Sequence, residues 1–282
     1  MKITTITPTK IFRTKDGGYS RSVDRIEAQL KSLRSQKTNA EICPIISDLS
    51  SDSEIIEQFK NICKKYDAKY INTKTNLVWN KPLALNIGIR SSDLDSDLMI
   101  SLDADIILRD SVIQRCLKNK NANNVIVCQT YMYSENMYNF KDFSKKNCEK
   151  CRDKGKFLNL SGNGGLQCFD REWLFKVRGY DERYNLWGGI DNEIIKRAKF
   201  DKREVVWLNG IDKEILLIHL HHSKKTSSIP GLSSAFVYEY KSKYNVPRYK
   251  SKWVSAIVNP KSWGNAKRVI GPRRVGGDFI IK

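Results

Sequence analysis

The first 110 residues alternate between two hydrophobic periods. Short runs rich in β-branched residues predict four strands, at residues 3–7, 41–47, 69–72 and 97–102. Between the first two of these, Val23, Ile26, Leu30 and Leu33 are spaced by three, four and three residues and share one helix face. Strands that alternate with helices predict a mostly parallel sheet covered by helices, with ligands bound beyond the carboxyl ends of the strands.

Two more helices in this half are marked by their first turns. Ser51 and Glu54 have the spacing of a capping box, ahead of a helix that carries Ile55, Phe59 and Ile62. Pro82 suits the first turn of the next helix, because a proline there leaves no amide hydrogen unpaired.

From residue 111 the pattern is less regular. It predicts strands at 125–131 and 166–169 and near Val205 and Ile215, with helices beginning at Arg171 and ending at Lys199. A polar, basic stretch at 141–156 has little periodicity and is interpreted as a mobile excursion, either a lid that orders over a bound ligand or an idle loop.

The composition is that of a folded protein. The chain has 282 residues, of which 40% are hydrophobic, enough for one large core, and this excludes a disordered or fibrous protein. No secretory signal is visible, and the apolar runs fall far short of the ~18 residues that a membrane span needs. The seven cysteines are an odd number and several lie in apolar segments, which favours free thiols in a reducing compartment. The single CxxC of Cys148 and Cys151 is interpreted as a loop. We therefore expect a cytoplasmic protein.

The charge is strongly basic and unevenly distributed. The net charge is +19, and residues 241–282 contribute ten of it, with eleven Lys and Arg against one acidic residue. This segment suits an anionic membrane surface, an acidic polysaccharide or nucleic acid. Trp253 and Trp263 interleave with basic residues, which suits a membrane interface and equally suits single-stranded nucleic acid. Peripheral contact with the inner face of a membrane, or with a polyanion, is the preferred interpretation; nucleic acid and an inert solvated tail are the alternatives.

Two carboxylates follow an apolar strand directly. Asp103 and Asp105 come after the run at 98–102, at the sheet edge where a parallel sheet binds ligands. Alternate residues of an extended segment point the same way, so both carboxylates can coordinate one hard cation. That cation can in turn bind a diphosphate. A strand-end turn also favours Asp for structural reasons alone.

All three histidines of the chain lie within four residues. His219, His221 and His222 end the apolar run at 215–218. Imidazoles at a strand end are common metal ligands, and a set of Asp and His favours Mn²⁺ over Mg²⁺.

A further candidate is the segment Trp187-Gly-Gly-Ile-Asp-Asn-Glu193. Its two glycines allow the backbone to approach a ligand closely. Asp191 is either a helix cap or a general base, and the Trp187 indole offers a flat face for a sugar ring.

Together these segments resemble an inverting GT-A-fold glycosyltransferase over residues 1–223. The first half is similar to family 2 glycosyltransferases at Ile6-Thr-Pro-Thr9, Ile45-Ile-Ser-Asp-Leu-Ser-Ser-Asp52, Asn80-Lys-Pro-Leu-Ala-Leu-Asn86 and Asp103-Ala-Asp105. The second half is similar to galactosyltransferases and chondroitin polymerases at Gly164-Gly165, Val177-Arg-Gly-Tyr-Asp-Glu182 and Trp187 to Glu193.

The resemblance implies a Rossmann-like α/β fold, with a mostly parallel central sheet and helices on both faces. A nucleotide-binding half, 1–110, and an acceptor half, 111–223, would form one domain, followed by a basic C-terminal extension at 224–282. The implied reaction is metal-dependent transfer of a sugar from a UDP-sugar to a hydroxyl of a glycan or other acceptor. The alternatives are a nucleic-acid-binding protein and a glycosyltransferase that modifies a DNA base.

The resemblance also implies roles for individual residues. Asp191 would be the base, and Asp105, His219 and His222 would hold Mn²⁺ or Mg²⁺, with Asp103 facing the ribose and the metal. The other implied contacts are with the nucleotide (Pro8, Thr9, Asp48 against the uracil, Lys81) and with the acceptor (Trp187, Gly188, Gly164, Gly165). Ile190 stands where the family usually has a Glu that helps to hold the acceptor sugar, so the acceptor is not implied.

Overall fold

A seven-stranded sheet forms the centre of the molecule in the computed structural model, which describes residues 1–12, 23–132, 156–157, 163–186, 188–212, 214–220, 234–252, 254–269, 271–275 and 278–281. Four of its six strand pairings are parallel, and β9 pairs antiparallel with both of its neighbours. The strands, in spatial order, are β10 (Glu204–Trp207), β6 (Asn124–Cys128), β9 (Leu166–Asp170), β4 (Leu98–Leu102), β1 (Lys2–Thr9), β2 (Glu41–Asp48) and β3 (Lys69–Asn72).

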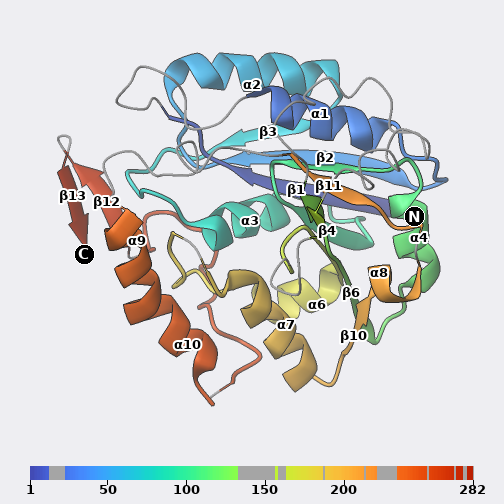
Figure 1. The fold of residues 1–282 in the computed structure, drawn as a ribbon. Helices are drawn as coiled ribbons and strands as arrows, with labels where there is room; N and C mark the ends of the chain where they lie inside the picture. The colour runs from blue at the N-terminus through green and yellow to red at the C-terminus, as the bar shows by residue number, and fades with distance from the viewer. Residues whose placement is uncertain are drawn as a thin grey trace.

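Helices cover both faces of this sheet, as expected (Figure 1). On one face lie α1 (Val23–Arg34), α2 (Ser53–Lys65) and α4 (Val112–Asn119); on the other lie α3 (Lys81–Arg90), α6 (Arg171–Lys176) and α7 (Ile190–Phe200). Successive strand residues alternate between the two cores: Ile100 packs in the first and Met99 in the second.

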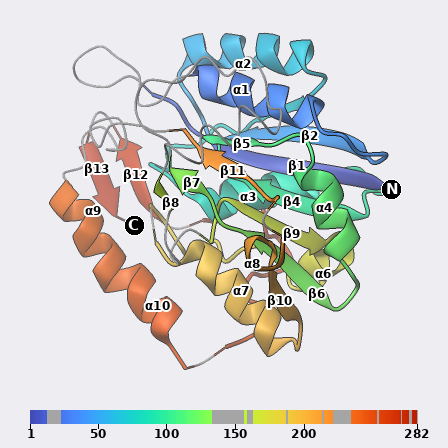
Figure 2. The same cartoon turned by 45° about the vertical axis from the view of Figure 1, so that its right-hand side comes forward.

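A small second sheet lies beside the carboxyl ends of the central strands (Figure 2). It consists of β5 (Ile106–Leu108), β11 (Leu217–His219), β7 (Tyr131–Met132) and β8 (Lys156–Phe157). The predicted strand at 125–131 is therefore two strands, because the chain leaves the central sheet after β6 and joins the second one at β7. Residues 141–155, with Cys148 and Cys151, lie outside the described residues.

The predicted capping box at Ser51 is wrong. Helix α2 has Asp52 as its N-cap residue. The Ser51 hydroxyl instead donates to Asp48 Oδ1 at 2.5 Å and accepts from the Ile11 amide at 2.7 Å, so it ties two strand ends together.

The described part of the C-terminal segment packs against the domain. After the short α8 (Leu208–Ile211) come α9 (Ser234–Tyr240), the π-helix η1 (Lys241–Asn245), α10 (Val246–Lys250) and a hairpin of β12 (Pro272–Val275) and β13 (Asp278–Ile281). Trp263 is only 5% exposed and packs in the core cluster that contains α3 and α6, so it is not available as a membrane-interface anchor. None of the described helices has the length and apolar composition to cross a bilayer.

Candidate active site

Lys81 joins two of the predicted site residues. Its ammonium Nζ lies 2.7 Å from Asp103 Oδ1 and 2.8 Å from Asp191 Oδ1, although the two carboxylates are 88 residues apart in the chain. The first turn of α3 is fixed by Asn80, whose side-chain oxygen caps the Leu83 amide at 2.7 Å and whose side-chain nitrogen donates to the Glu182 carbonyl at 2.9 Å. The helix start thereby holds Lys81 between the Asp103 turn and the first turn of α7, which carries Asp191.

Charge in this cluster is negative, whereas the protein as a whole is basic. Burial disfavours the Lys81 ammonium, but Asp103 and Asp191 outweigh that effect and raise its pKa above the usual value. Burial also raises the pKa of Asp103, against the opposing influence of Lys81, and Asp191 and Asp105 add repulsion. One ammonium faces three carboxylates, and this local surplus favours the binding of a cation.

The turn that carries Asp103 and Asp105 is held from beneath by Gln29 of α1. Its Nε2 donates to the carbonyls of Asp103 at 2.5 Å and Ile106 at 3.1 Å, and its Oε1 accepts from the Thr7 hydroxyl at 2.6 Å. Gln29 is fully buried, so these bonds are shielded from water. It fixes the backbone from which both carboxylates project.

Two of the predicted metal ligands, Asp105 and His219, lie close together. Asp105 is 4% exposed, and its Oδ2 lies 3.4 Å from His219 Nε2. Pairing of β11 with β5 places His219 opposite Ile106, and the Leu220 amide donates to the Asp105 carbonyl at 2.8 Å. An oxygen and an imidazole nitrogen at this separation fit two ligands of one Mn²⁺.

The third predicted ligand cannot be placed beside these two. His221 and His222 lie outside the described residues. Within the ranges that the structure describes, no group of three His, Cys, Asp or Glu side chains could hold a metal ion.

Asp191 lies in the first turn of α7 and is not the helix cap. The N-cap residue is Gly189, which has the left-handed φ of 83° that glycine adopts freely. The Asp191 carbonyl accepts from Gln167 Nε2 at 3.0 Å, and the Tyr180 hydroxyl donates to Gln167 Oε1 at 2.9 Å. This buried chain of bonds positions the helix start, and the Asp191 carboxylate is directed to Lys81.

Each of the predicted acceptor glycines lies against a different side chain: Asp191, Thr130 or Lys241. A Cβ on Gly164 would clash with the Asp191 carboxylate, and one on Gly165 would clash with Thr130. Gly188, with φ of 94°, lies against the side chain of Lys241 from η1. Trp187 lies outside the described residues.

Replacing Gly164 with Ala is expected to displace the Asp191 carboxylate and to lower turnover by about 10²-fold, the effect of a misplacement of roughly 1 Å. The fold should tolerate the change, because the clash is with a side chain. Gly210→Ala is the matched control, since nothing lies within 4 Å of the Cβ it adds. Steady-state kinetics of the two variants test this, and equal turnover would contradict the assigned role of the Gly164 position.

The predicted nucleotide residues Pro8, Thr9 and Asp48 lie at the same edge, at the ends of β1 and β2. Thr9 pairs with Asp48 in the sheet register. The Asp48 carboxylate is 1% exposed and already accepts bonds from the Tyr70 hydroxyl at 2.7 Å and Asn72 Nδ2 at 2.6 Å, besides Ser51. It is two strands away from β4, so it marks the other end of the candidate site from the Lys81 cluster.

Two family profiles cover most of the chain. Residues 19–178 match glycosyl transferase family 2, and residues 148–223 match the N-terminal domain of galactosyltransferase. No curated protein sequence matches the chain significantly.

Solved structures with low sequence identity share the fold. GalNAc-T7 with UDP, GalNAc and Mn²⁺ superposes with a TM-score of 0.59 at 14% identity, over 88% of this chain and 50% of that one. Drosophila β1,4-galactosyltransferase 7 with xylobiose gives 0.52 at 11% identity, over 99% and 91%. S. aureus TarS 1–349 with UDP-GlcNAc gives 0.52 at 14%, over 91% and 69%. This chain thus spans about half the length of the GalNAc-T7 structure.

The family match extends over more than half of the chain, and it includes the first three strands after β1, the Asp103-Ala-Asp105 turn and Lys81. The α/β architecture, with helices on both faces of a mostly parallel sheet, is that of the GT-A neighbours. The chain belongs to glycosyl transferase family 2 and has a GT-A fold.

Proposed function

We propose that this enzyme transfers a sugar from a UDP-sugar to a hydroxyl of a glycan acceptor, with a divalent metal ion and with inversion at the anomeric carbon. One observation carries the proposal: Lys81 holds Asp191 and Asp103 within reach of a single ammonium. This puts the candidate base next to the carboxylate pair expected at the donor diphosphate. That the neighbouring structures hold UDP, UDP-GlcNAc and Mn²⁺ supports the choice of donor and metal.

Asp105 and His219 would hold Mn²⁺, or Mg²⁺, with His222 as the further ligand from the same segment. The bound metal would supply positive charge against the charge that develops on the departing UDP. Asp103, which is partly exposed, would face the ribose and the metal. The buried Gln29 would keep both carboxylates in position before the donor arrives.

The nucleotide would lie along the edge from Asp48 to Lys81, over the backbone of Pro8 and Thr9. Asp48 accepts bonds at both oxygens, so a uracil imide would reach it by replacing one of the present donors. Asn72 and Tyr70 are the partners suited to give way, because both are partly exposed, whereas Ser51 is buried and remains to hold the carboxylate.

Asp191 would accept the proton of the attacking hydroxyl. Its Oδ1 is held by Lys81, and its Oδ2 packs against Gly164, at the place that a Cβ would otherwise occupy. The acceptor oxygen would attack the anomeric carbon from the face opposite UDP, which inverts its configuration. Gly165, Gly188 and Trp187 would line the same acceptor region.

Release of UDP from a panel of UDP-sugars, with and without Mn²⁺ and with a set of oligosaccharide acceptors, tests the proposal. Metal-dependent release with one sugar is expected, and the NMR coupling constant of the product's anomeric proton reports the configuration. Retained configuration would contradict the base role of Asp191. Absence of Mn²⁺-dependent UDP binding would contradict the donor assignment and favour a nucleic-acid-binding protein.

A further inference from the structure

A hollow of about 570 Å³ lies between α7, the loop that precedes it and the C-terminal segment, and is called here the C-terminal pocket. In Figure 1, α10 lies beside α7 at this place. The described lining includes three tyrosines, namely Tyr184, Tyr244 and Tyr249, and five basic residues, namely Arg183, Lys196, Arg197, Lys243 and Arg248. The pocket and the residues around it play no part in the proposed transfer chemistry.

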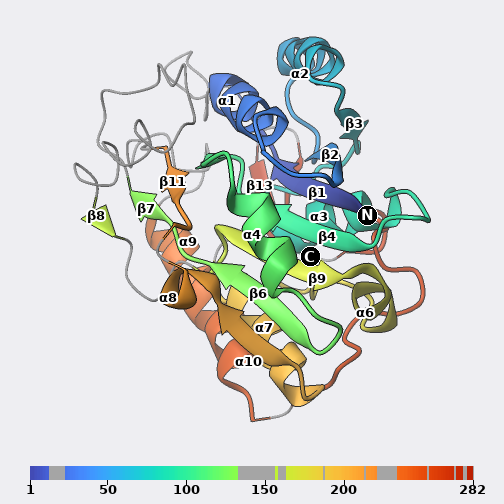
Figure 3. The same cartoon turned by 90° about the vertical axis from the view of Figure 1, so that its right-hand side faces the viewer.

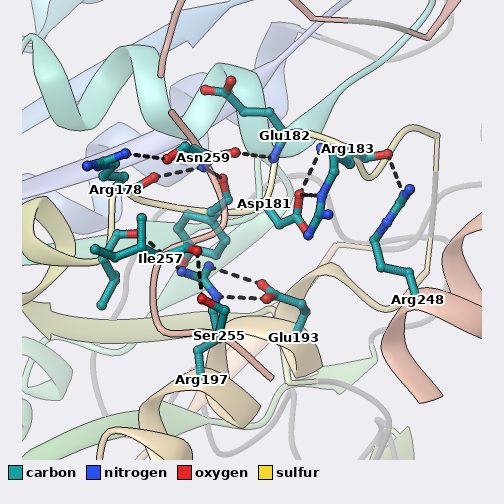
Figure 4. A network of polar contacts seen from close by, with 12 residues as sticks. Arg178, Asp181, Glu182, Arg183, Glu193, Arg197, Arg248, Ser255, Ile257 and Asn259 are labelled. Carbon is teal, nitrogen blue, oxygen red and sulfur yellow. Dashed lines mark hydrogen bonds and ion pairs between the residues drawn. The ribbon is translucent and has the colours of Figure 1, made fainter. Parts of the chain in front are cut away.

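Both carboxylates of the described lining are already neutralised by arginines (Figure 4). Arg197 makes a bidentate pair with Glu193, at 2.7 and 3.0 Å, and Arg183 makes one with Asp181, at 2.8 and 2.7 Å. Burial raises the pKa of Glu193, and the neighbouring Arg197 opposes this shift. Each pair is electrically neutral, so the two pairs add no net charge to the pocket.

The other three cations of the lining have no carboxylate partner among the described residues. Lys196 donates to the backbone carbonyls of Tyr249, at 3.1 Å, and Ser251, at 2.5 Å. Arg248 donates to the carbonyl of Arg183 at 2.9 Å and lies 5.5 Å over the Tyr184 ring. Lys243 lies 5.6 Å over the Tyr244 ring. Five Lys and Arg against two carboxylates leave a surplus of three positive charges in the pocket, which favours an anionic ligand.

The pocket adjoins the acceptor side of the active site. The Gly188–Gly189 turn leads into Asp191, and Gly189 lies against Tyr184 and Tyr249, which both line the pocket. Lys196 follows Asp191 by five residues on the same helix, roughly 7.5 Å along its axis at ~1.5 Å per residue and about 140° around it. Since the Gly188–Gly189 turn touches both the pocket and the start of α7, an acceptor whose hydroxyl meets Asp191 would reach the pocket with a neighbouring sugar by passing this turn.

The hollow also continues beyond Arg248. A second hollow of about 520 Å³ shares Arg183, Tyr244 and Arg248 with the first and extends toward Tyr240 and Val269. The helix between them contains the π-helical turn η1, a feature that is frequent at functional sites. The Tyr244 ring, which is 36% exposed, offers a face on which a sugar ring can pack, whereas Tyr184 is fully buried. The shape, the rings and the charge together suit an oligosaccharide that carries anionic groups.

We propose that the C-terminal pocket binds carboxylate or sulfate groups of the acceptor, so that the acceptor is an acidic glycan. The identity of the acceptor rests on the proposed function, but binding in the pocket does not require the donor.

The test is titration calorimetry on the full chain without donor, with hexagalacturonate, its methyl ester and a sulfated galactan hexamer as probes. At least one of the two acidic hexamers should bind; for hexagalacturonate, the methyl ester should bind about tenfold more weakly or worse.

Lys243→Gln combined with Arg248→Gln should weaken binding of the acidic hexamer by about tenfold or more, because a hydrogen bond to a charged group is typically worth that factor. Lys199→Gln combined with Lys202→Gln is the matched control, because both side chains are exposed on or just after α7 and lie outside the lining. The control should retain wild-type affinity. Circular dichroism and thermal unfolding check that both double variants are folded.

Three results would overturn the proposal: no binding of either acidic hexamer, equal loss in both double variants, or tighter binding of phosphatidylglycerol vesicles or a single-stranded oligonucleotide that the pocket variant alone abolishes. UDP release measured in parallel separates this proposal from the previous one. Binding of the acidic hexamer without any UDP release would support the pocket proposal and contradict the transfer reaction. Transfer to a neutral acceptor without binding of either acidic hexamer would support the transfer reaction and contradict the pocket proposal.

Discussion

Asp191→Asn is expected to lower turnover by ~10²–10⁴-fold, the usual contribution of a general base, and to leave UDP binding intact. The amide keeps the size of the carboxylate and can still offer its oxygen to Lys81 at the place of the present 2.8 Å contact. It cannot accept the proton of the acceptor hydroxyl. Single-turnover kinetics at saturating donor and acceptor, together with calorimetry of UDP binding, measure the two effects separately.

Asp67→Asn is the matched control for this variant. It removes the same charge from a carboxylate that is 99% exposed on the surface, and Asn tolerates the positive φ of 46° at that position. Turnover of the control should equal that of the wild type. If Asp191→Asn were as active as the control, another residue would have to act as the base.

Asp105→Ala is expected to abolish metal-dependent binding of UDP. The side chain is almost fully buried beside His219, so no neighbouring carboxylate can take its place without moving the Gln29-supported turn. In the wild type, Mn²⁺ and UDP together should raise the unfolding temperature, because ligands that bind only the folded state stabilise it. In the variant that rise should disappear.

Asp105→Asn distinguishes loss of a ligand from loss of packing. The amide fills the same space but is a weaker ligand for a hard cation. It should therefore restore the unfolding temperature of the metal-free protein without restoring the response to Mn²⁺ and UDP. A normal response in both variants would remove Asp105 from the metal site.

Local patterns predicted the strands and helices of the first half well. The strands expected at 3–7, 41–47, 69–72 and 97–102 are β1 to β4, with ends that differ by at most two residues. Hydrophobic period, a proline in a first turn and apolar runs are all local signals. Asp103, Asp105 and Asp191 could be found in the same way, because each follows a recognisable strand end or glycine turn.

What the local pattern could not predict depends on contacts between distant parts of the chain. Gln29 and Gln167 look like ordinary polar residues in an amphipathic helix and a strand, yet they hold Asp103 and Asp191 through bonds across 74 and 24 residues. The partition of 125–131 between two sheets also depends on β11, which is far away in sequence. Ser51 fits a capping box by spacing, but tertiary bonds to Asp48 and Ile11 take its hydroxyl.

The position of β9 has a consequence for how the chain is made. It lies between β4 and β6 and bonds to both (Figure 3), so among the described residues the strand hydrogen bonds that join the two parts of the central sheet all pass through residues 166–170. The 68 residues from the end of β4 at 102 to the end of β9 at 170 take roughly 3–14 s to synthesise at ~5–20 residues per second. During that interval the edge of β4, an entirely apolar strand apart from Ser101, has no partner and is open to aggregation. We therefore expect that fragments ending before residue 170, which leave this edge unpaired, are insoluble.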